Sequence, residues 1–297
     1  MATPVSVSSP APLVSAVDGF GGVVALLTME PHDGSVIEAT VAMAGEGWPW
    51  RAWLPLAMPA RVECPWGVPP AQALALDHLA RRQDALAHLA MMRRTAARLG
   101  QTLSCAAVEF PERALAKSIV ARVRAAGLVV LGAPPERAMV AGPRWFDQVV
   151  SMSGRPVLVV PRCARIAGPP RRILIAWHDR PEACRALHDA LPWLRAAAAV
   201  RIVIAVGYGA SRAQRQAVAG TERLRAHLAH HGVSTEVACV DSQMRPPEDI
   251  LLEEAYSMAA DLIVAGASGR HRTLAFAFGG TTLSLIRRSR LPLLLAS

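Results

Sequence analysis

From residue 171 to the C-terminus, short apolar runs alternate with longer stretches in which apolar residues recur at helical spacing. The runs that predict strands are residues 171–177, 200–206, 233–240, 261–266 and 291–297. The stretches that predict helices are residues 181–198, 211–232, 246–260 and 280–289. Continuously apolar strands separated by helices are typical of a parallel sheet that is covered on both faces. This part of the chain is therefore predicted to be a doubly wound α/β unit of five strands.

The first half of the chain repeats the same order of elements. Its predicted strands are residues 23–29, 51–58, 102–109, 128–134 and 155–161, and its predicted helices are residues 34–45, 70–100, 112–127 and 144–154. Between the halves, Gly168, Pro169 and Pro170 interrupt all periodicity. We therefore expect two tandem five-stranded units, residues 1–161 and residues 173–297, joined by a linker at residues 162–172.

The last predicted strand of each unit is apolar throughout. Residues 155–161 and 291–297 would each leave a hydrophobic sheet edge exposed if the units stood apart. Pairing the two strands with each other would satisfy both backbones, so we expect the units to pack as a pseudo-dimer within one chain. The alternatives are that a loop covers each edge, or that each edge pairs with another chain in a homodimer.

Composition narrows the classes of partner. The chain has 297 residues, of which 52% are hydrophobic and only 5% aromatic, and its net charge is +9. Lys117 is the only lysine, so arginine carries nearly all of the positive charge. The arginines are scattered through the predicted helices and do not form a block, and few aromatic residues are available to stack on bases. Nucleic-acid binding is therefore not expected.

Cysteine usage and the absence of targeting signals indicate a location. The five cysteines are far apart and form no C-x-x-C pair, and they are Cys64, Cys105, Cys163, Cys184 and Cys239. We interpret them as reduced, mostly buried residues. The first residues lack a basic region, and no apolar stretch reaches the roughly 18 residues that a membrane span needs. The sequence therefore predicts a cytoplasmic protein that does not enter membranes.

Several chemical motifs are missing or incomplete. Since Lys117 lies in "LAKSIV", no Gly-Lys-Ser/Thr phosphate loop exists. The stretch "GYGASR" has Arg212 where a dinucleotide fingerprint needs its third glycine, and Ser268 in "GASG" does not fit a G-x-S-x-G nucleophile elbow. We therefore interpret both stretches as ordinary loops, and the sequence gives no sign of a dehydrogenase or a hydrolase.

Three histidines lie close together in the sequence near the end of one predicted helix. His227, His230 and His231 have the i, i+3, i+4 spacing that could face a metal ion. They also precede Gly232, and histidines suit the negative end of the helix dipole. We favour the helix-end interpretation over the metal site.

A glycine-rich loop follows the predicted strand 261–266. Gly266, Gly269 and Gly279 are spaced G-x2-G-x9-G, and Gly280, Thr281 and Thr282 then open a helix. Ligands of open α/β sheets bind beyond the carboxyl ends of the strands, and a helix N-terminus offers unpaired N–H groups to an anion. Arg270 can add positive charge. The pattern predicts a phosphate-binding loop, and the alternative is a tight turn that needs glycine only for its shape.

With this spacing on the last crossover of a five-stranded unit, residues 171–297 resemble the universal stress protein family, especially its tandem bacterial members. The resemblance is carried by "AWHDRPEACRALHDALPWL" and "IVAGASGRHRTLAFAFGGTTLSLIRRSRLPLLLAS", whereas residues 23–161 match in topology only. It implies an adenine nucleotide alpha hydrolase-like, Rossmann-like fold that binds ATP or AMP, with or without Mg²⁺. It also implies phosphates on the glycine loop, adenine near the end of the first strand, and dimer contacts through the last strand.

The resemblance assigns candidate binding residues in the second unit. Those on the phosphate side are Gly266, Gly269, Arg270, Gly279, Gly280, Thr281 and Thr282. Val206 falls on the adenine side, as do His178 and Asp179, which stand where the family has an acidic or amide residue. Gly280 replaces the usual Ser or Thr, and Thr281 follows it.

The first unit departs further from the family pattern. It keeps Gly132 and Gly142, but Pro134 and Pro135 stand where the loop should turn around phosphate, and proline donates no amide hydrogen. We therefore expect a nucleotide only in the second unit. The resemblance implies a stress-response regulatory module with no catalytic residue assigned and with unknown protein partners. The alternatives are a ligand-free interaction scaffold and a slow ATP-hydrolysing enzyme at the same loop.

Overall fold

A computed structural model describes residues 22–45, 48–58, 71–135, 145–206, 212–267 and 279–297. Its strands are β1 (Val23–Leu26), β2 (Trp50–Met58), β3 (Ser104–Pro111), β4 (Leu128–Gly132), β5 (Val157–Val160), β6 (Arg172–Ala176), β7 (Ala199–Val206), β8 (Glu236–Asp241), β9 (Leu262–Gly266) and β10 (Leu293–Ala296). Its α-helices are α1 (Asp33–Ala44), α2 (Ala71–Arg98), α3 (Leu115–Val123), α5 (Trp145–Met152), α6 (Pro181–Ala196), α7 (Arg212–His230), α8 (Pro247–Ser257) and α9 (Gly280–Arg288).

The strands form one continuous ten-stranded sheet in the order β3-β2-β1-β4-β5-β10-β9-β6-β7-β8. Within each half all strand pairs are parallel, and the order reverses at β1/β4 in the first half and at β6/β9 in the second. Both halves therefore have the predicted doubly wound topology, in which each reversal point opens a crevice at the carboxyl ends of the strands.

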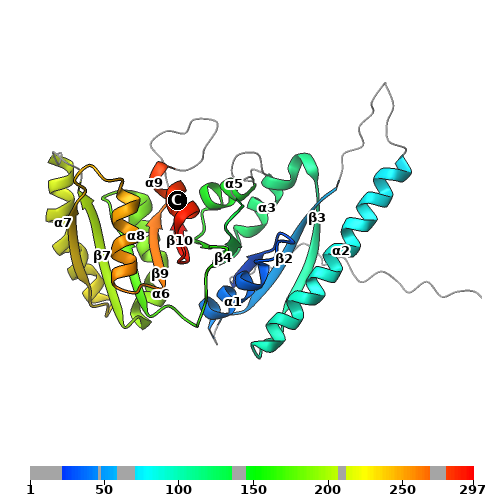
Figure 1. Cartoon of the computed structure of the whole chain (residues 1–297), viewed down its shortest axis with the longest axis horizontal. Coiled ribbons are helices and arrows are strands. Elements are labelled where there is room, and N and C mark those ends of the chain that lie inside the picture. Colours follow the sequence, from blue (N-terminus) through cyan, green and yellow to red (C-terminus); the bar gives the residue numbers. More distant parts are fainter. Residues whose placement is uncertain (1–21, 46–47, 59–70, 136–144, 207–211, 268–278) are drawn as a thin grey trace, which may run out of the picture.

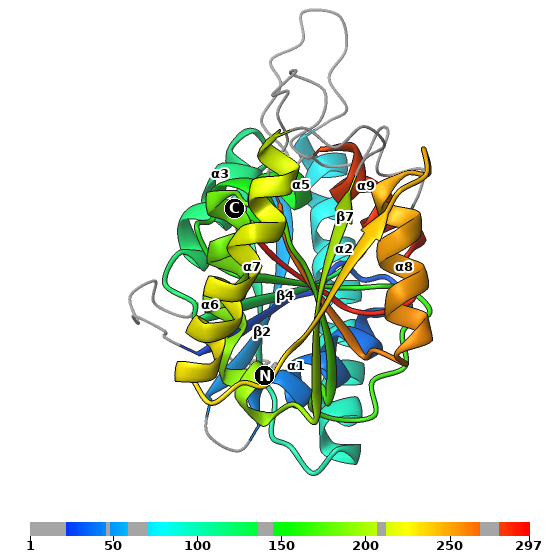
Figure 2. The ribbon, with the colours of Figure 1, turned by 90° about the vertical axis from the view of Figure 1, so that its left-hand side faces the viewer.

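Helices cover both faces of the sheet, and each face has its own hydrophobic core. One core joins the sheet to α1, α2, α6 and α7, and the other joins it to α3, α5, α8 and α9. Figure 1 shows α5 and α9 above the central strands with α1 and α6 below them, and Figure 2 shows α7 and α8 on opposite sides of β7. This layering explains why the strands are apolar on both faces.

The two units join through their last strands, as the sequence predicted. Strand β5 pairs with β10 in antiparallel orientation, with Leu158 opposite Leu294, and these two side chains are 1% and 0% exposed. A second contact joins the helices below the sheet, where the indole Nε1 of Trp193 in α6 donates to the carbonyl oxygen of Met43 in α1 at 3.1 Å. The pseudo-dimer is thus confirmed, and each unit covers the sheet edge that the other would expose.

Candidate functional site

The two units can be compared position by position because their strands have the same register. Leu26 pairs with Leu131 in the first unit, and Ala176 pairs with Ala265 in the second. Counting onward from these pairs, Gly132 corresponds to Gly266, and His32 corresponds to Glu182. The two crevices can therefore be compared at equivalent residues.

Gly266 ends β9 in the second unit, where the first turn of α6 approaches the sheet closely. A Cβ atom added at Gly266 would lie 2.7 Å from Cγ of Glu182 and 2.9 Å from the backbone nitrogen of Ala183. Only glycine fits beneath this backbone atom. The close packing of α6 thus gives Gly266 a structural role of its own, which the sequence prediction of a phosphate contact did not include.

Helix α9 begins beside this strand end with its first amide groups uncapped. Gly279 is the N-cap residue in an extended conformation, no side chain of the described residues caps the helix, and its first turn contains no acidic residue. The first intrahelical bond runs from the amide of Leu283 to the carbonyl of Gly279 at 3.1 Å. The amides of Gly280, Thr281 and Thr282 therefore lack intrahelical acceptors, which makes this helix start suited to an anion.

The two threonines of this turn have different surroundings. The hydroxyl of Thr282 is buried and donates to the carbonyl oxygen of Gly266 at 3.3 Å, which ties α9 to the end of β9. Thr281 is half-buried. Of the predicted phosphate contacts, the structure thus brings Gly266, Gly279, Gly280 and both threonines together, while Gly269 and Arg270 lie outside the described residues.

The predicted adenine-side residues lie at the carboxyl ends of the adjacent strands. His178 and Asp179 follow β6 and are exposed, and His178 Nε2 lies 3.5 Å from Oε1 of Glu182 in the first turn of α6. Val206 ends β7, where its carbonyl oxygen accepts a hydrogen bond from the amide of Ser242 at 2.7 Å. These residues and the α9 turn lie at the same carboxyl edge of the second unit, at or beside its reversal point.

The equivalent place in the first unit is filled by a buried imidazole. His32 is 7% exposed, and a Cβ added at Gly132 would lie 1.9 Å from its Nε2. Neither ring nitrogen has a hydrogen-bond partner among the residues that the structure describes. Sequence reasoning missed His32, since nothing in "MEPHDG" marks a histidine that will lie against Gly132, 100 residues later in the chain.

The helix that follows the first-unit crevice also differs from α9. Helix α5 begins with Trp145, followed by the buried Phe146 and by Asp147, an acidic residue in the first turn. A carboxylate there competes with any anion for the positive end of the helix dipole. Pro134 and Pro135 follow β4 in this unit and donate no amide hydrogens.

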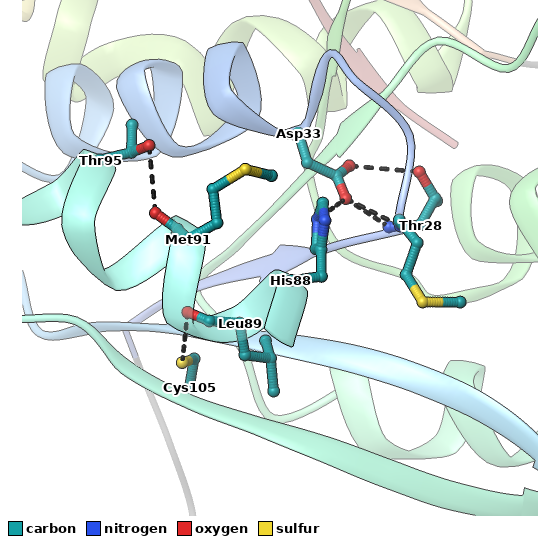
Figure 3. Close-up of polar contacts among 8 residues, drawn as sticks. Thr28, Asp33, His88, Leu89, Met91, Thr95 and Cys105 are labelled. Carbon is teal, nitrogen blue, oxygen red and sulfur yellow. Dashed lines mark hydrogen bonds and ion pairs between the residues drawn. The ribbon is translucent and has the colours of Figure 1, made fainter. Parts of the chain in front are cut away.

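A neighbouring cluster stabilises the turn after β1 (Figure 3). The carboxylate of Asp33 is fully buried and accepts hydrogen bonds from the amides of Thr28 and Met29, both at 2.9 Å, and from the Thr28 hydroxyl at 3.2 Å. It also lies 2.9 Å from Nε2 of His88 in α2. Met29 has a φ of 61°, a left-handed conformation that these bonds stabilise. An internal carboxylate thus occupies the amides of this turn in the first unit.

We predict that His32 makes the protein less stable in acid. Burial lowers the pKa of His32 below its usual 6.5, and Arg162 lowers this pKa further, while Asp33 and Glu30 oppose the shift. The unfolded chain then binds more protons than the native state as pH falls below about 6.5, so stability falls with pH. Urea unfolding gives the free energy of unfolding at pH 7 and at pH 5. Between these two pH values, this free energy should fall less for His32→Leu than for the wild type. Equal losses in the two proteins would contradict the prediction.

The three histidines lie at the end of α7, as the sequence favoured, and the positive φ of Gly232 closes the helix. The helix ends at His230, Gly232 has a φ of 77°, and the amide of Val233 donates to the carbonyl of Leu228 at 2.9 Å. The Arg195 guanidinium lies 3.0 Å from Nδ1 of His231. Within the described ranges, no group of three His, Cys, Asp or Glu residues could hold a metal ion.

The expectation of mostly buried cysteines is wrong for three of the four that are described. Cys163, Cys184 and Cys239 are exposed, and Cys105 is half-buried. Partial burial raises the pKa of the Cys184 thiol, and the neighbouring Asp179 and Glu182 raise it further. Burial likewise raises the pKa of Cys105. Both thiols are therefore poor nucleophiles at neutral pH.

Three comparisons place the chain among known proteins. Residues 170–297 match the universal stress protein family. A universal stress protein structure from Archaeoglobus fulgidus DSM 4304 matches with a TM-score of 0.66 and 12% identity, over 93% of this chain and 98% of that chain. A functionally unknown protein from Pseudomonas aeruginosa PAO1 matches with a TM-score of 0.53 and 14% identity, over 93% and 92%.

A search of curated proteins finds no match. Among the described residues, no helix has the length and apolar character needed to cross a membrane. At these low identities the two structural matches establish the fold of both halves, and the family model matches the second half alone. Residues 170–297 are therefore similar to the universal stress protein family, and they are joined in tandem to a first unit of the same fold.

Proposed function

We propose that the second unit binds one adenine nucleotide, ATP or AMP, and that the protein acts as a cytoplasmic stress-response regulatory module. The observation that carries this proposal is the uncapped start of α9, where three amides without intrahelical acceptors lie beside the reversal point of the strand order. A phosphate bound there gains both hydrogen bonds and the favourable helix dipole. The glycines at positions 279 and 280 leave the backbone accessible to it.

The surroundings of this helix start favour a negatively charged ligand. Gly280 is exposed, and a Cβ added there would meet nothing within 4 Å. Since the first turn of α9 has no acidic residue, no carboxylate of that turn competes for its amides. His178 and Asp179, which follow the neighbouring strand β6, offer hydrogen-bonding groups for a ribose or a base. Mg²⁺, where present, would accompany the nucleotide.

We expect one nucleotide per chain, because side chains of the first unit occupy the place that is equivalent to the proposed site. In its crevice His32 lies over Gly132, and Asp33 holds the amides of Thr28 and Met29. Its α5 begins with Trp145 where α9 has small residues. We infer that this unit serves as the structural partner of the second. Since β5 and β10 already pair with each other, a homodimer or another protein partner would have to use a different surface.

The test places a charge at the proposed phosphate position. Gly280→Asp puts a carboxylate into open space at the start of α9, where it suits the helix dipole but repels phosphate. Gly280→Asn is the matched neutral control. We expect calorimetric titration of ligand-free wild type to give one ATP or AMP site per chain. Gly280→Asp should bind at least about tenfold more weakly, which corresponds to about 1.4 kcal/mol, while Gly280→Asn binds nearly as well as the wild type.

Thermal unfolding separates this effect from misfolding, because Gly280→Asp should unfold at or above the temperature of Gly280→Asn. No measurable affinity for adenine nucleotides up to millimolar concentration would favour a ligand-free interaction scaffold. Two equivalent sites per chain would contradict the structural role of the first unit. If Gly280→Asp and Gly280→Asn bound the nucleotide equally well, the phosphate could not lie at the start of α9, and the proposed position would be wrong.

A further inference from the structure

A cavity of about 360 Å³ lies between the two units, beneath the segment that links them. Its walls come from α1, β5, the linker at residues 165–171, and the residues at the amino ends of β9 and β10. Leu262, the first residue of β9, lines the cavity, whereas the proposed nucleotide site lies beyond Gly266, the last residue of that strand. The cavity is therefore separate from that site and does not depend on the function proposed for it.

The inner wall of the cavity is apolar. Ala39, Leu158 and Leu262 line it and are each 1% exposed, and Met43 is 7% exposed. Small side chains leave room here, since α1 contributes two alanines, Ala39 and Ala42, to the lining. The volume falls within the range of about 300–1,000 Å³ that is usual for small-molecule sites. An occupant of the inner part must therefore be hydrophobic.

The position in the second unit that corresponds to the α1 wall of the cavity carries a larger side chain. Counted from Leu26 and Ala176, Met43 in α1 corresponds to Trp193 in α6. The Trp193 indole is 7% exposed and is hydrogen-bonded to the Met43 carbonyl. The second unit thus fills with a large ring the position where the first unit has a methionine at the cavity wall.

The linker side of the cavity carries positive charge. Arg165 and Arg171 line it and are exposed, and among the described residues neither guanidinium group contacts a carboxylate. The one acidic residue in the lining, Asp261, already accepts hydrogen bonds from the backbone amides of Arg171 at 2.8 Å and Arg172 at 3.0 Å. The side chains of Arg165 and Arg171 therefore remain available to a ligand carboxylate.

We propose that this cavity binds a small amphipathic anion, with its apolar body against α1 and β5 and its carboxylate at Arg165 and Arg171. A medium-chain fatty carboxylate fits the space, since 360 Å³ is the volume of about twelve water molecules in the liquid, and decanoate has twelve non-hydrogen atoms. Because the ligand would touch both units and the linker, it would stabilise their junction.

The experiment compares decanoate with decanol, which has the same chain but no charge. Calorimetric titration of the full chain should give one decanoate site, with decanol at least about tenfold weaker. In the double variant Arg165→Gln/Arg171→Gln, the affinity for decanoate should fall to that for decanol. The affinity for decanol should stay the same as in the wild type. In Ala42→Leu, where the longer side chain fills the cavity, both ligands should lose binding.

The Arg165→Gln/Arg171→Gln variant changes only exposed side chains, so it tests the proposal even if Ala42→Leu fails to fold. Titration with ATP serves as a separate readout, because neither variant touches the start of α9. The proposal is overturned if decanoate does not bind at 1 mM, which is about the weak end of useful affinities. It is equally overturned if decanol binds as well as decanoate, or if a folded Ala42→Leu retains full binding.

Discussion

Leu294→Asp should destabilise both units together. Leu294 is fully buried in β10 opposite Leu158 of β5, at the centre of the strand pair that joins the units. Removing a buried leucine side chain costs about 2–5 kcal/mol, and a buried charge without a partner costs several kcal/mol more. We expect a loss of at least about 5 kcal/mol, which lowers the unfolding temperature by about 10–20 °C for a chain of this size.

Hydrogen exchange shows whether the loss crosses the junction. Backbone amides of Val157–Val160 in the first unit should lose protection as much as those of Leu262–Gly266 in the second, because β5 loses its partner strand. The matched control is Val237→Asp in the edge strand β8, where the side chain is 36% exposed. It should cost about 1 kcal/mol. If the first unit kept its protection in Leu294→Asp, the units would be energetically independent.

The fold could be predicted because its signals are local and repeated. Continuous apolar runs such as "RILIA" and "LVVLG" identify buried parallel strands, and both became strands with nearly the expected bounds. The pairing of β5 with β10 followed from a single argument, that two apolar edges in one chain are best covered by each other. These inferences need only the period and the position of apolar residues.

The candidate site was harder to predict because the same residue type can serve either the packing of the fold or the binding of a ligand. Gly266 fitted a phosphate loop in the sequence, yet the approach of Ala183 already requires glycine at that position. Thr282 was expected at a phosphate, whereas its hydroxyl bonds the Gly266 carbonyl. His32 carries no signal at all, since the strand that it covers is distant in the sequence. Packing that joins remote segments cannot be derived from spacing alone.

The contact between Asp33 and His88 is another such feature, and its removal should have the second large effect. The two residues are 55 positions apart, and the pair links the start of α1 to the long helix α2 (Figure 3). Asp33→Ala would leave the amides of Thr28 and Met29 and the His88 imidazole without their acceptor. A donor left without its acceptor costs about 1–3 kcal/mol when it is buried, so we expect the loss of these hydrogen bonds to cost several kcal/mol in total.

Urea unfolding measures this loss, and Asp33→Asn is its matched control. The asparagine carbonyl can still accept the two amide hydrogen bonds, so this variant should lose only about 1–2 kcal/mol. A double-mutant cycle of Asp33→Ala with His88→Ala should give a coupling of about 1–3 kcal/mol, as expected for residues in direct contact. ATP binding by the second unit should stay unchanged in every folded variant, because the cluster belongs to the first unit. A coupling near zero would mean that Asp33 stabilises the turn after β1 through its amide bonds alone, and that α2 is held by its apolar residues.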